Sequence, residues 1–451
     1  MSIERGRQSG LKRIFDAGLA SARAEPNDLH YIGRGEEAIL RFSLSPSGRT
    51  SMTVRLRRMS FWAVIIASQL AVLEIGCFLF TQLRPNLFDY RETALAKLQP
   101  AEFDRFKETV ASNRLGWDNP ATLTKLRNCL GKEVTYSYDQ ARVRLHSERR
   151  SQDALILVTG DSYTQGADVS DEDTYPAALE RILGVPVANL GVGGYGPDQA
   201  LLKLETLIEH FPQARIAVLS IVYDDTSRLV NSFRPILFRD TGIHFGLKPF
   251  VRNGAFHPLV GGDPFRDLTA MRAAAEIAFD TDFWRRPQRK FPYSGAVVEM
   301  ISLPSFWIPL LTQLGKSLGK PHYEVLHRVR SIRMNLHAIY DRFAKWTSAR
   351  GLRGVVAFIP VGGADRTSGL VAISAATPDQ HKAVTFMNVE ISDWNQFNTT
   401  PGCHPTPGGY RMIAWRPWCG QCSPTSRTLR RSARYQSSSR DPLSRRLRSD
   451  A

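Results

Sequence analysis

ALILVTGDSYTQG, residues 154–166, is the stretch that decides the fold of this chain. Its first half is a short apolar run that ends in Gly160, which is typical of a buried strand in a parallel sheet. The pattern that follows predicts a helix at 175–183, a strand at 186–191, a helix at 197–210 and a strand at 215–223. This alternation predicts βαβ units, and therefore an α/β fold: a three-layer α/β/α sandwich around a parallel sheet.

The sequence on either side of this block predicts the rest of the domain. A helix at about 323–350 leads into one more apolar strand at 354–361, after an insertion around 230–350. Residues 82–150 have mixed composition, with an alternating pattern at 134–146, and predict a short lead-in that contains β-strands. The domain is therefore expected at 151–414. In open α/β sheets the ligand site lies beyond the carboxyl ends of the strands.

The motif at the end of the first strand is Gly160-Asp161-Ser162. It is not the G-x-S-x-G elbow of α/β-hydrolases, because the second residue after the serine is Thr164. Three more blocks follow at later strand ends: Asn189-Leu-Gly-Val-Gly-Gly194, Tyr223-Asp224-Asp225 and Pro401-Gly-Cys-His404. Together, in this order, the four blocks resemble those of the SGNH (GDSL-type) hydrolase family, in its membrane-anchored periplasmic branch.

The resemblance implies serine chemistry. Ser162 would be the nucleophile and His404 the base that takes its proton, since a serine hydroxyl is a poor nucleophile by itself. The backbone N–H groups of Ser162 and Gly194 would form the oxyanion hole, with a side chain from the third block. The alternative is a purely structural role, in which Ser162 caps a helix and His404 is an ordinary loop residue.

Two positions depart from the family pattern. Asp224 stands where the family has an asparagine that donates to the oxyanion, and an ionised carboxylate there would repel the developing charge. Pro401 stands where the family has the aspartate that orients the histidine. Either a Ser162–His404 dyad operates, oriented by a backbone carbonyl, or an upstream carboxylate such as Asp393 substitutes.

Residues 60–80, SFWAVIIASQLAVLEIGCFLF, are apolar over the length that crosses a bilayer, with Glu74 as the one charge. We expect a transmembrane anchor at 59–81. Arg55, Arg57 and Arg58 precede it, so the positive-inside rule predicts a cytoplasmic extension at 1–58 and a periplasmic or extracellular catalytic domain on a bacterial-type inner membrane. A buried core helix and a cleaved signal peptide are weaker alternatives. A second apolar stretch, 295–314, is broken by charge and prolines and favours a buried or interfacial segment.

The net charge of +16 is concentrated at the two ends of the chain. Residues 1–58 carry eleven Lys and Arg against six Asp and Glu, and residues 415–451 carry nine Arg against two Asp. No aromatic-interleaved basic motif accompanies them, which argues against a nucleic-acid partner. The Arg- and Ser-rich run at 415–451 predicts a basic disordered tail. We interpret it as the product of a reading-frame change, and residues 1–51 as either a mobile extension or an overlong start.

Other motifs are weak. WCGQC at 418–422 resembles a thioredoxin redox motif, but too little sequence follows it to build that domain. No motif indicates a metal, nucleotide or other cofactor. The leading hypothesis is hydrolysis or transfer of a small acyl ester, such as acetyl on an envelope glycan or another acylated small molecule. The competing hypothesis is a glycan-binding or assembly protein that kept the fold and lost the chemistry.

Overall fold

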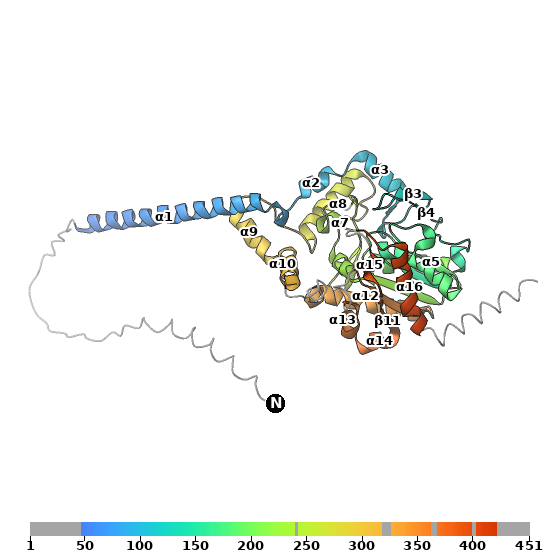
Figure 1. Ribbon diagram of the computed structural model, residues 1–451. Coiled ribbons are helices and arrows are strands. Elements are labelled where there is room, and N and C mark those ends of the chain that lie inside the picture. Colours follow the sequence, from blue (N-terminus) through green and yellow to red (C-terminus); the bar gives the residue numbers. More distant parts are fainter. Residues whose placement is uncertain (1–46, 240–241, 318–325, 362–367, 399–402, 422–451) are drawn as a thin grey trace, which may run out of the picture. The chain divides into compact units, whose positions relative to one another are not determined.

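The computed structural model describes residues 47–239, 242–317, 326–361, 368–398 and 403–421 (Figure 1). The chain divides into two compact units, Met1–Ser68 and Gln69–Ala451. A long helix, α1 (Ser47–Leu83), begins in the first unit and ends in the second. The other described helices and strands belong to the second unit.

A five-stranded parallel sheet forms the centre of the second unit, in the order β11-β10-β7-β5-β6. Its strands are β5 (Ile156–Thr159), β6 (Val187–Asn189), β7 (Ile216–Val222), β10 (Arg353–Ile359) and β11 (Val384–Asn388). On β5, Val158 pairs with Asn189 on one side and with Val218 on the other. The predicted α/β class and parallel sheet are confirmed, and β11 is a strand that the sequence pattern did not predict.

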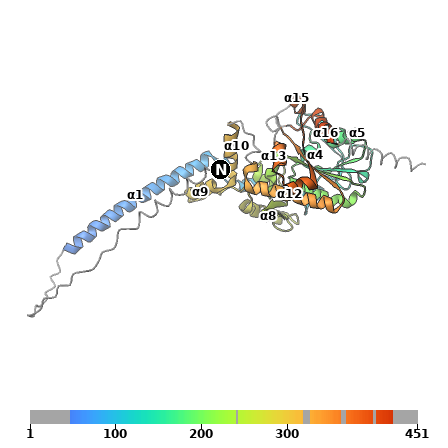
Figure 2. The same cartoon turned by 90° about the horizontal axis from the view of Figure 1, so that it is seen from below.

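Helices cover both faces of this sheet. Leu157 packs into one apolar cluster with residues of α6 (Pro197–Leu207) and α12 (Arg330–Ala349). Its neighbour Val158 packs into the other cluster, with α5 (Tyr175–Leu183) and α16 (Pro407–Gln421). Successive strand residues point to opposite faces, so both sides of the sheet are buried. Figure 2 shows the strands with α12 on one side and α5 and α16 on the other.

The remaining elements surround this sandwich. The lead-in contains two helices, which were not predicted, as well as short strands: α2 (Arg91–Ala96), α3 (Pro100–Thr109), β1 (Ala111–Ser112), β2 (Gly116–Trp117), β3 (Thr124–Arg127) and β4 (Glu133–Tyr136). The insertion contributes α7 (Arg234–Leu237), β8 (Phe250–Arg252), β9 (Ala255–His257), α8 (Leu268–Thr281), α9 (Tyr293–Ser302) and α10 (Pro304–Ser317). Smaller helices are α4 (Ser162–Gln165), α13 (Ser368–Ala375), α14 (Pro378–Ala383) and α15 (Trp394–Phe397). Most of the predicted extension at 1–58 and of the basic tail at 415–451 lies outside the described residues.

Within the part of α1 from Val54 to Leu83, the most apolar window of 18 residues has a mean hydropathy of 2.1 and is not buried inside the structure. This helix is long and apolar enough to cross a membrane, and it contains the predicted anchor at 59–81. The pair Tyr293–Ser302 and Pro304–Gly315 passes the same composition test together but is bent by 60°. This helix pair contains residues 295–314, the stretch that the sequence analysis interpreted as a buried or interfacial segment.

Candidate active site

Ser162 stands at the sharp turn between β5 and α4. Asp161 caps this one-turn helix by accepting a hydrogen bond from Tyr163 N at 3.0 Å. Gly166 ends the helix with φ of +85°, a left-handed conformation that glycine adopts without strain. Because α4 starts directly after the strand, Ser162 lies at the carboxyl edge of the sheet, where ligand sites of this architecture occur.

A hydrogen-bonded chain runs from Ser162 through His404 to Asp168. His404 Nε2 lies 2.9 Å from Ser162 Oγ, and His404 Nδ1 lies 3.1 Å from Asp168 Oδ2. The same carboxylate oxygen accepts the backbone N–H of His404 at 3.2 Å. With Nδ1 donating to the carboxylate, Nε2 is free to accept the serine proton, which is the geometry of a nucleophile, a base and an orienting acid.

Asp168 stands on the loop that follows α4, at a φ of +68° that few residues other than glycine, asparagine and aspartate adopt. Partial burial raises the pKa of its carboxyl. The hydrogen bonds from His404 lower it, as does the one from the backbone N–H of Cys129 at 3.1 Å, and the net shift of the pKa is downward. Asp168 is therefore ionised at neutral pH, and its negative charge would stabilise the positive charge of a protonated His404.

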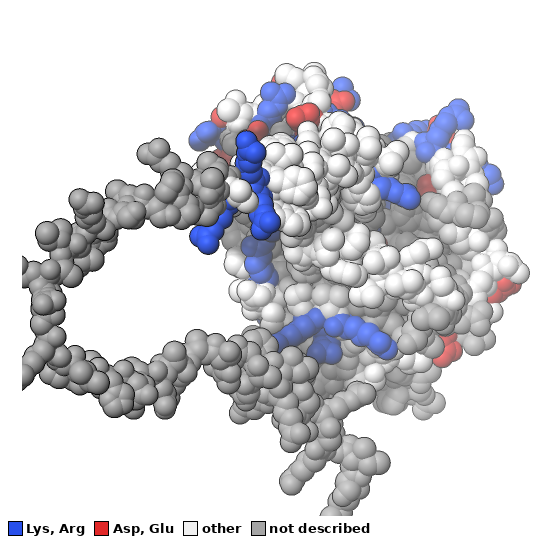
Figure 3. Space-filling model, turned by 90° about the vertical axis from the view of Figure 1, so that its left-hand side faces the viewer, with Lys and Arg blue, Asp and Glu red and all other residues white. Residues whose placement is uncertain are grey.

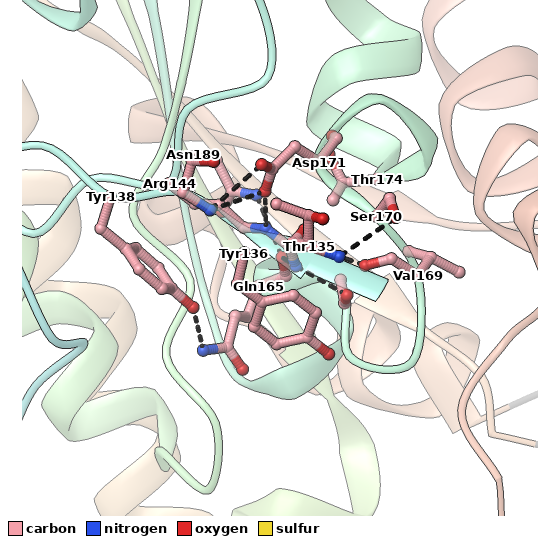
Figure 4. Close-up of polar contacts among 12 residues, drawn as sticks. Thr135, Tyr136, Tyr138, Arg144, Gln165, Val169, Ser170, Asp171, Thr174 and Asn189 are labelled. Atoms are coloured by element: carbon pink, nitrogen blue, oxygen red, sulfur yellow. Dashed lines mark hydrogen bonds and ion pairs between the residues drawn. The ribbon is translucent and has the colours of Figure 1, made fainter. Parts of the chain in front are cut away.

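The fully buried guanidinium of Arg144 holds the Asp168 loop in shape (Figure 4). It donates to the backbone oxygens of Gln165 at 2.6 Å, Gly166 at 2.7 Å and Val169 at 2.8 Å. It also pairs with Asp171 at 2.9 Å. Several charge-assisted hydrogen bonds to one loop fix its path on both sides of Asp168, so we regard Arg144 as a positioning residue.

A disulfide joins Cys129, in the turn between β3 and β4, to Cys403, which directly precedes His404. The same turn bonds to Asp168, because Asn128 Nδ2 donates to its backbone oxygen at 3.0 Å. One turn of the lead-in is thus bonded to the acid and covalently linked to the loop of the base. The sequence analysis did not predict this bond, since the two cysteines are 274 residues apart.

The structure brings together only some of the residues selected from sequence. Asp393 does not contact His404; it caps α15 by accepting the backbone N–H groups of Asn395 and Gln396. Asp168 occupies the place for which Asp393 was proposed. Pro401 and the side chain of Asp224 lie outside the described residues.

Gly194 has φ of +81°, and a methyl group at this position would approach Ile243 Cδ1 to 2.7 Å. Among the described residues, no acceptor binds the N–H of Gly194 or of Ser162. Both N–H groups are therefore available as donors, and the oxyanion-hole assignment stays a prediction.

A cavity of about 530 Å³ opens beside Ser162 and His404. Part of its wall is charged: Arg228 contacts Asp225 at 2.5 Å and lies 3.9 Å from Asp161. Burial raises the pKa of Asp225 well above its usual value, and Asp161 raises it further, although Arg228 opposes both. Most of the remaining wall is apolar and comes from the insertion, including Ile236, Leu237, Phe238, Trp284, Ile308, Pro309 and Leu326.

Comparisons with known proteins find distant likenesses among solved structures. No family model matches the chain, and no curated protein matches it. Among solved structures, a chain from Desulfitobacterium hafniense DCB-2 is similar; it is provisionally described as a lipolytic protein of the G-D-S-L family. The two are 10% identical, the match covers 57% of this chain and 94% of the other, and the TM-score is 0.25.

Proposed function

We propose that this chain is a serine esterase or O-acyltransferase that uses Ser162, His404 and Asp168. The observation that carries the proposal is the unbroken chain of hydrogen bonds among these residues at the mouth of a cavity. Ser162 Oγ attacks the ester carbonyl while His404 takes its proton. The alcohol leaves with that proton, and an acyl-serine remains.

The second half of the reaction distinguishes two activities. Attack by water on the acyl-serine makes the enzyme a hydrolase, whereas attack by a sugar hydroxyl makes it a transferase. The sequence suggested acetyl on an envelope glycan, and such a glycan remains a candidate acceptor. Adding a glycan acceptor is expected to divert acyl groups from water if the enzyme is a transferase.

Two side chains, Asp224 and Arg228, bear on the negative charge that develops on the substrate oxygen during acyl transfer. If Asp224 occupies the oxyanion hole, Asp224→Asn should raise esterase turnover, and an unchanged or lower rate would remove Asp224 from that role.

Arg228 supplies a positive charge to the same cavity, so Arg228→Gln is expected to lower turnover, by up to about 100-fold if it donates to the oxyanion. A normal rate in Arg228→Gln would show that Arg228 has only a structural role.

We further propose that the catalytic unit lies outside the cytoplasm. Two features support this: Arg55, Arg57 and Arg58 at the start of the candidate span, and the Cys129–Cys403 disulfide, which persists in oxidising compartments. A reporter enzyme that is active only outside the cytoplasm, fused to the C-terminus, should be active. Activity of the reciprocal cytoplasmic reporter would contradict this orientation.

Labelling with a fluorophosphonate probe tests the proposed chemistry. We expect the full chain in detergent to be labelled, and the label to be absent from Ser162→Ala. Ser305→Ala is a matched control, because Ser305 also lines the cavity but its hydroxyl donates to the backbone oxygen of Arg285 instead of to a histidine. An unlabelled wild-type chain would favour a binding protein that has lost its chemistry.

A further inference from the structure

Helices α9 and α10 expose several large apolar side chains. The exposed fraction is 68% for Val298, 43% for Trp307, 48% for Leu311 and 53% for Leu314. Figure 3 shows this side of the molecule, where uncharged atoms cover most of the described surface and Asp and Glu are few. Exposed large apolar side chains on two consecutive helices mark a contact with a partner or a membrane.

Contacts with α1 indicate whether this apolar surface faces a partner protein or a membrane. Glu74 on α1 accepts the backbone N–H groups of Tyr293 at 2.6 Å and of Ser294 at 3.2 Å, at the first turn of α9. Phe80, near the end of α1, packs against the small cluster of Phe88 and Met300. The α9 and α10 pair therefore lies beside the last turns of the candidate span, as Figure 1 also shows.

The position of Glu74 gives the depth of this contact. It precedes the last residue of α1, Leu83, by nine positions, which corresponds to about 13 Å along a helix. The hydrocarbon core of a bilayer is about 30 Å thick. If α1 spans it, the first turn of α9 lies within the hydrocarbon region. Glu74 binds backbone donors that would otherwise be unsatisfied there, which is what lipid requires of a helix end.

The opposite face of α10 lines the catalytic cavity. Ile308 and Thr312, four residues apart, are buried and form part of the cavity wall. Leu311 and Leu314 are exposed and are not part of that wall. Because residues four apart share a helix face, α10 separates the exposed apolar surface from the cavity of Ser162. Thr312 Oγ1 is buried without a hydrogen-bond partner among the described residues, so one wall of the cavity offers an unused hydroxyl.

We propose that α9 and α10 are embedded in the adjoining half of the bilayer, and that the acyl donor is a membrane lipid ester. Its chain would enter the cavity past α10. The proposal rests on the proposed acyl-transfer function. The cavity volume of about 530 Å³ is in the range for ligands much larger than acetyl, which are commonly bound in pockets of ~300–1,000 Å³. Ser162 Oγ forms the new ester bond, the lipid's own ester bond breaks, and the lysolipid alcohol leaves with the proton held by His404.

Fluorescence quenching tests the membrane contact independently of chemistry. The full chain is reconstituted in vesicles of phosphatidylcholine and phosphatidylglycerol that carry brominated acyl chains. We expect the quenched tryptophan signal to decrease in Trp307→Phe and to be unchanged in Trp346→Phe, because Trp346 lies on α12 and is buried in the core of the catalytic unit. An equal quenched signal in wild type and Trp307→Phe would overturn the embedding of α10.

Turnover of two esters tests the substrate. Wild-type chain in vesicles is given p-nitrophenyl acetate and a phospholipid with a fluorogenic acyl chain. In Leu311→Asp/Leu314→Asp we expect the ratio of lipid to acetate turnover to fall at least tenfold. Ile277→Asp, a similarly exposed position on α8, should leave that ratio within twofold.

Failure of this inference differs from failure of the proposed function. If the wild type consumes acetate but no lipid ester, or if Leu311→Asp/Leu314→Asp keeps the wild-type ratio, a lipid donor is wrong and the serine chemistry stands. If neither ester is consumed and the fluorophosphonate probe does not label Ser162, the proposed serine chemistry is wrong. The proposal of a lipid donor is then wrong as well.

Discussion

The two sides of Ser162 differ in chemistry and in origin. On one side, His404 and Asp168 form a polar chain, and the Asp168 loop is clamped by the buried Arg144. On the other side, the insertion supplies an apolar wall that includes Leu237 and Ile308. Under the proposed function, the polar side carries out acyl transfer and the apolar side selects the acyl group that reaches the serine. Changes on the two sides should therefore have separable effects on rate and on substrate choice.

The largest effect should come from the base on the polar side. His404→Ala removes the one base that, among the described residues, is hydrogen-bonded to Ser162 Oγ, so kcat should fall on the order of 10⁴-fold for every ester. His381→Ala is the matched control, because that histidine is exposed on α14. Steady-state hydrolysis of p-nitrophenyl acetate by the full chain measures both. A His404→Ala rate within tenfold of the wild-type rate would contradict the role of His404 as the base.

A smaller loss is expected from the clamp behind Asp168. Arg144→Lys keeps the charge but loses the planar fork that contacts several loop oxygens, so the carboxylate should shift relative to His404. We expect kcat to fall roughly 10- to 100-fold for acetate and for longer esters alike, with little change in KM. A change in KM for long esters alone would mean that Arg144 acts on substrate binding.

A change on the apolar side should alter substrate choice. Leu237→Trp fills part of the cavity from α7, so turnover of long-chain esters should fall about tenfold relative to turnover of acetate. Competition between an acetyl and a dodecanoyl ester measures this ratio. An unchanged ratio would show that the acyl chain does not occupy the cavity.

The disulfide should affect stability more than rate. Cys129→Ser/Cys403→Ser removes the covalent link between the lead-in and the loop of His404, and should lower the free energy of unfolding by about 2–4 kcal/mol. Thermal unfolding of the full chain in detergent, with and without reductant, measures it. Reductant should destabilise the wild type and leave the double variant unchanged, and equal stability of the two proteins would contradict the expectation.

Part of the polar side could be predicted from sequence, because Ser162 follows a buried strand. The apolar run before Ser162 and the helix at 175–183 correspond to β5 and α5. Asp168 was missed because the acid was sought near His404 in the chain, whereas it lies 236 residues away and six residues after Ser162. An aspartate in a loop rich in Gly, Asp and Ser was the available signal, since aspartate tolerates positive φ.

The apolar side could not be predicted in the same way. Its wall combines α7, α10 and other parts of the insertion, and no local periodicity shows which apolar residues face a cavity and which face lipid. Prolines and charge correctly marked 295–314 as unlike a straight span. The disulfide was missed because pairing of two distant cysteines depends on the tertiary fold.

The most direct test of the central claim compares Asp168→Asn with Asp393→Asn. Asparagine at 168 keeps the size of the side chain but cannot stabilise a protonated His404, so kcat/KM for p-nitrophenyl acetate at pH 7 should fall about 10³-fold or more. Asp393→Asn should stay within about twofold, because its side chain caps α15 away from His404 and asparagine caps equally well. A large loss in Asp393→Asn together with a near-normal Asp168→Asn would contradict the triad of Ser162, His404 and Asp168.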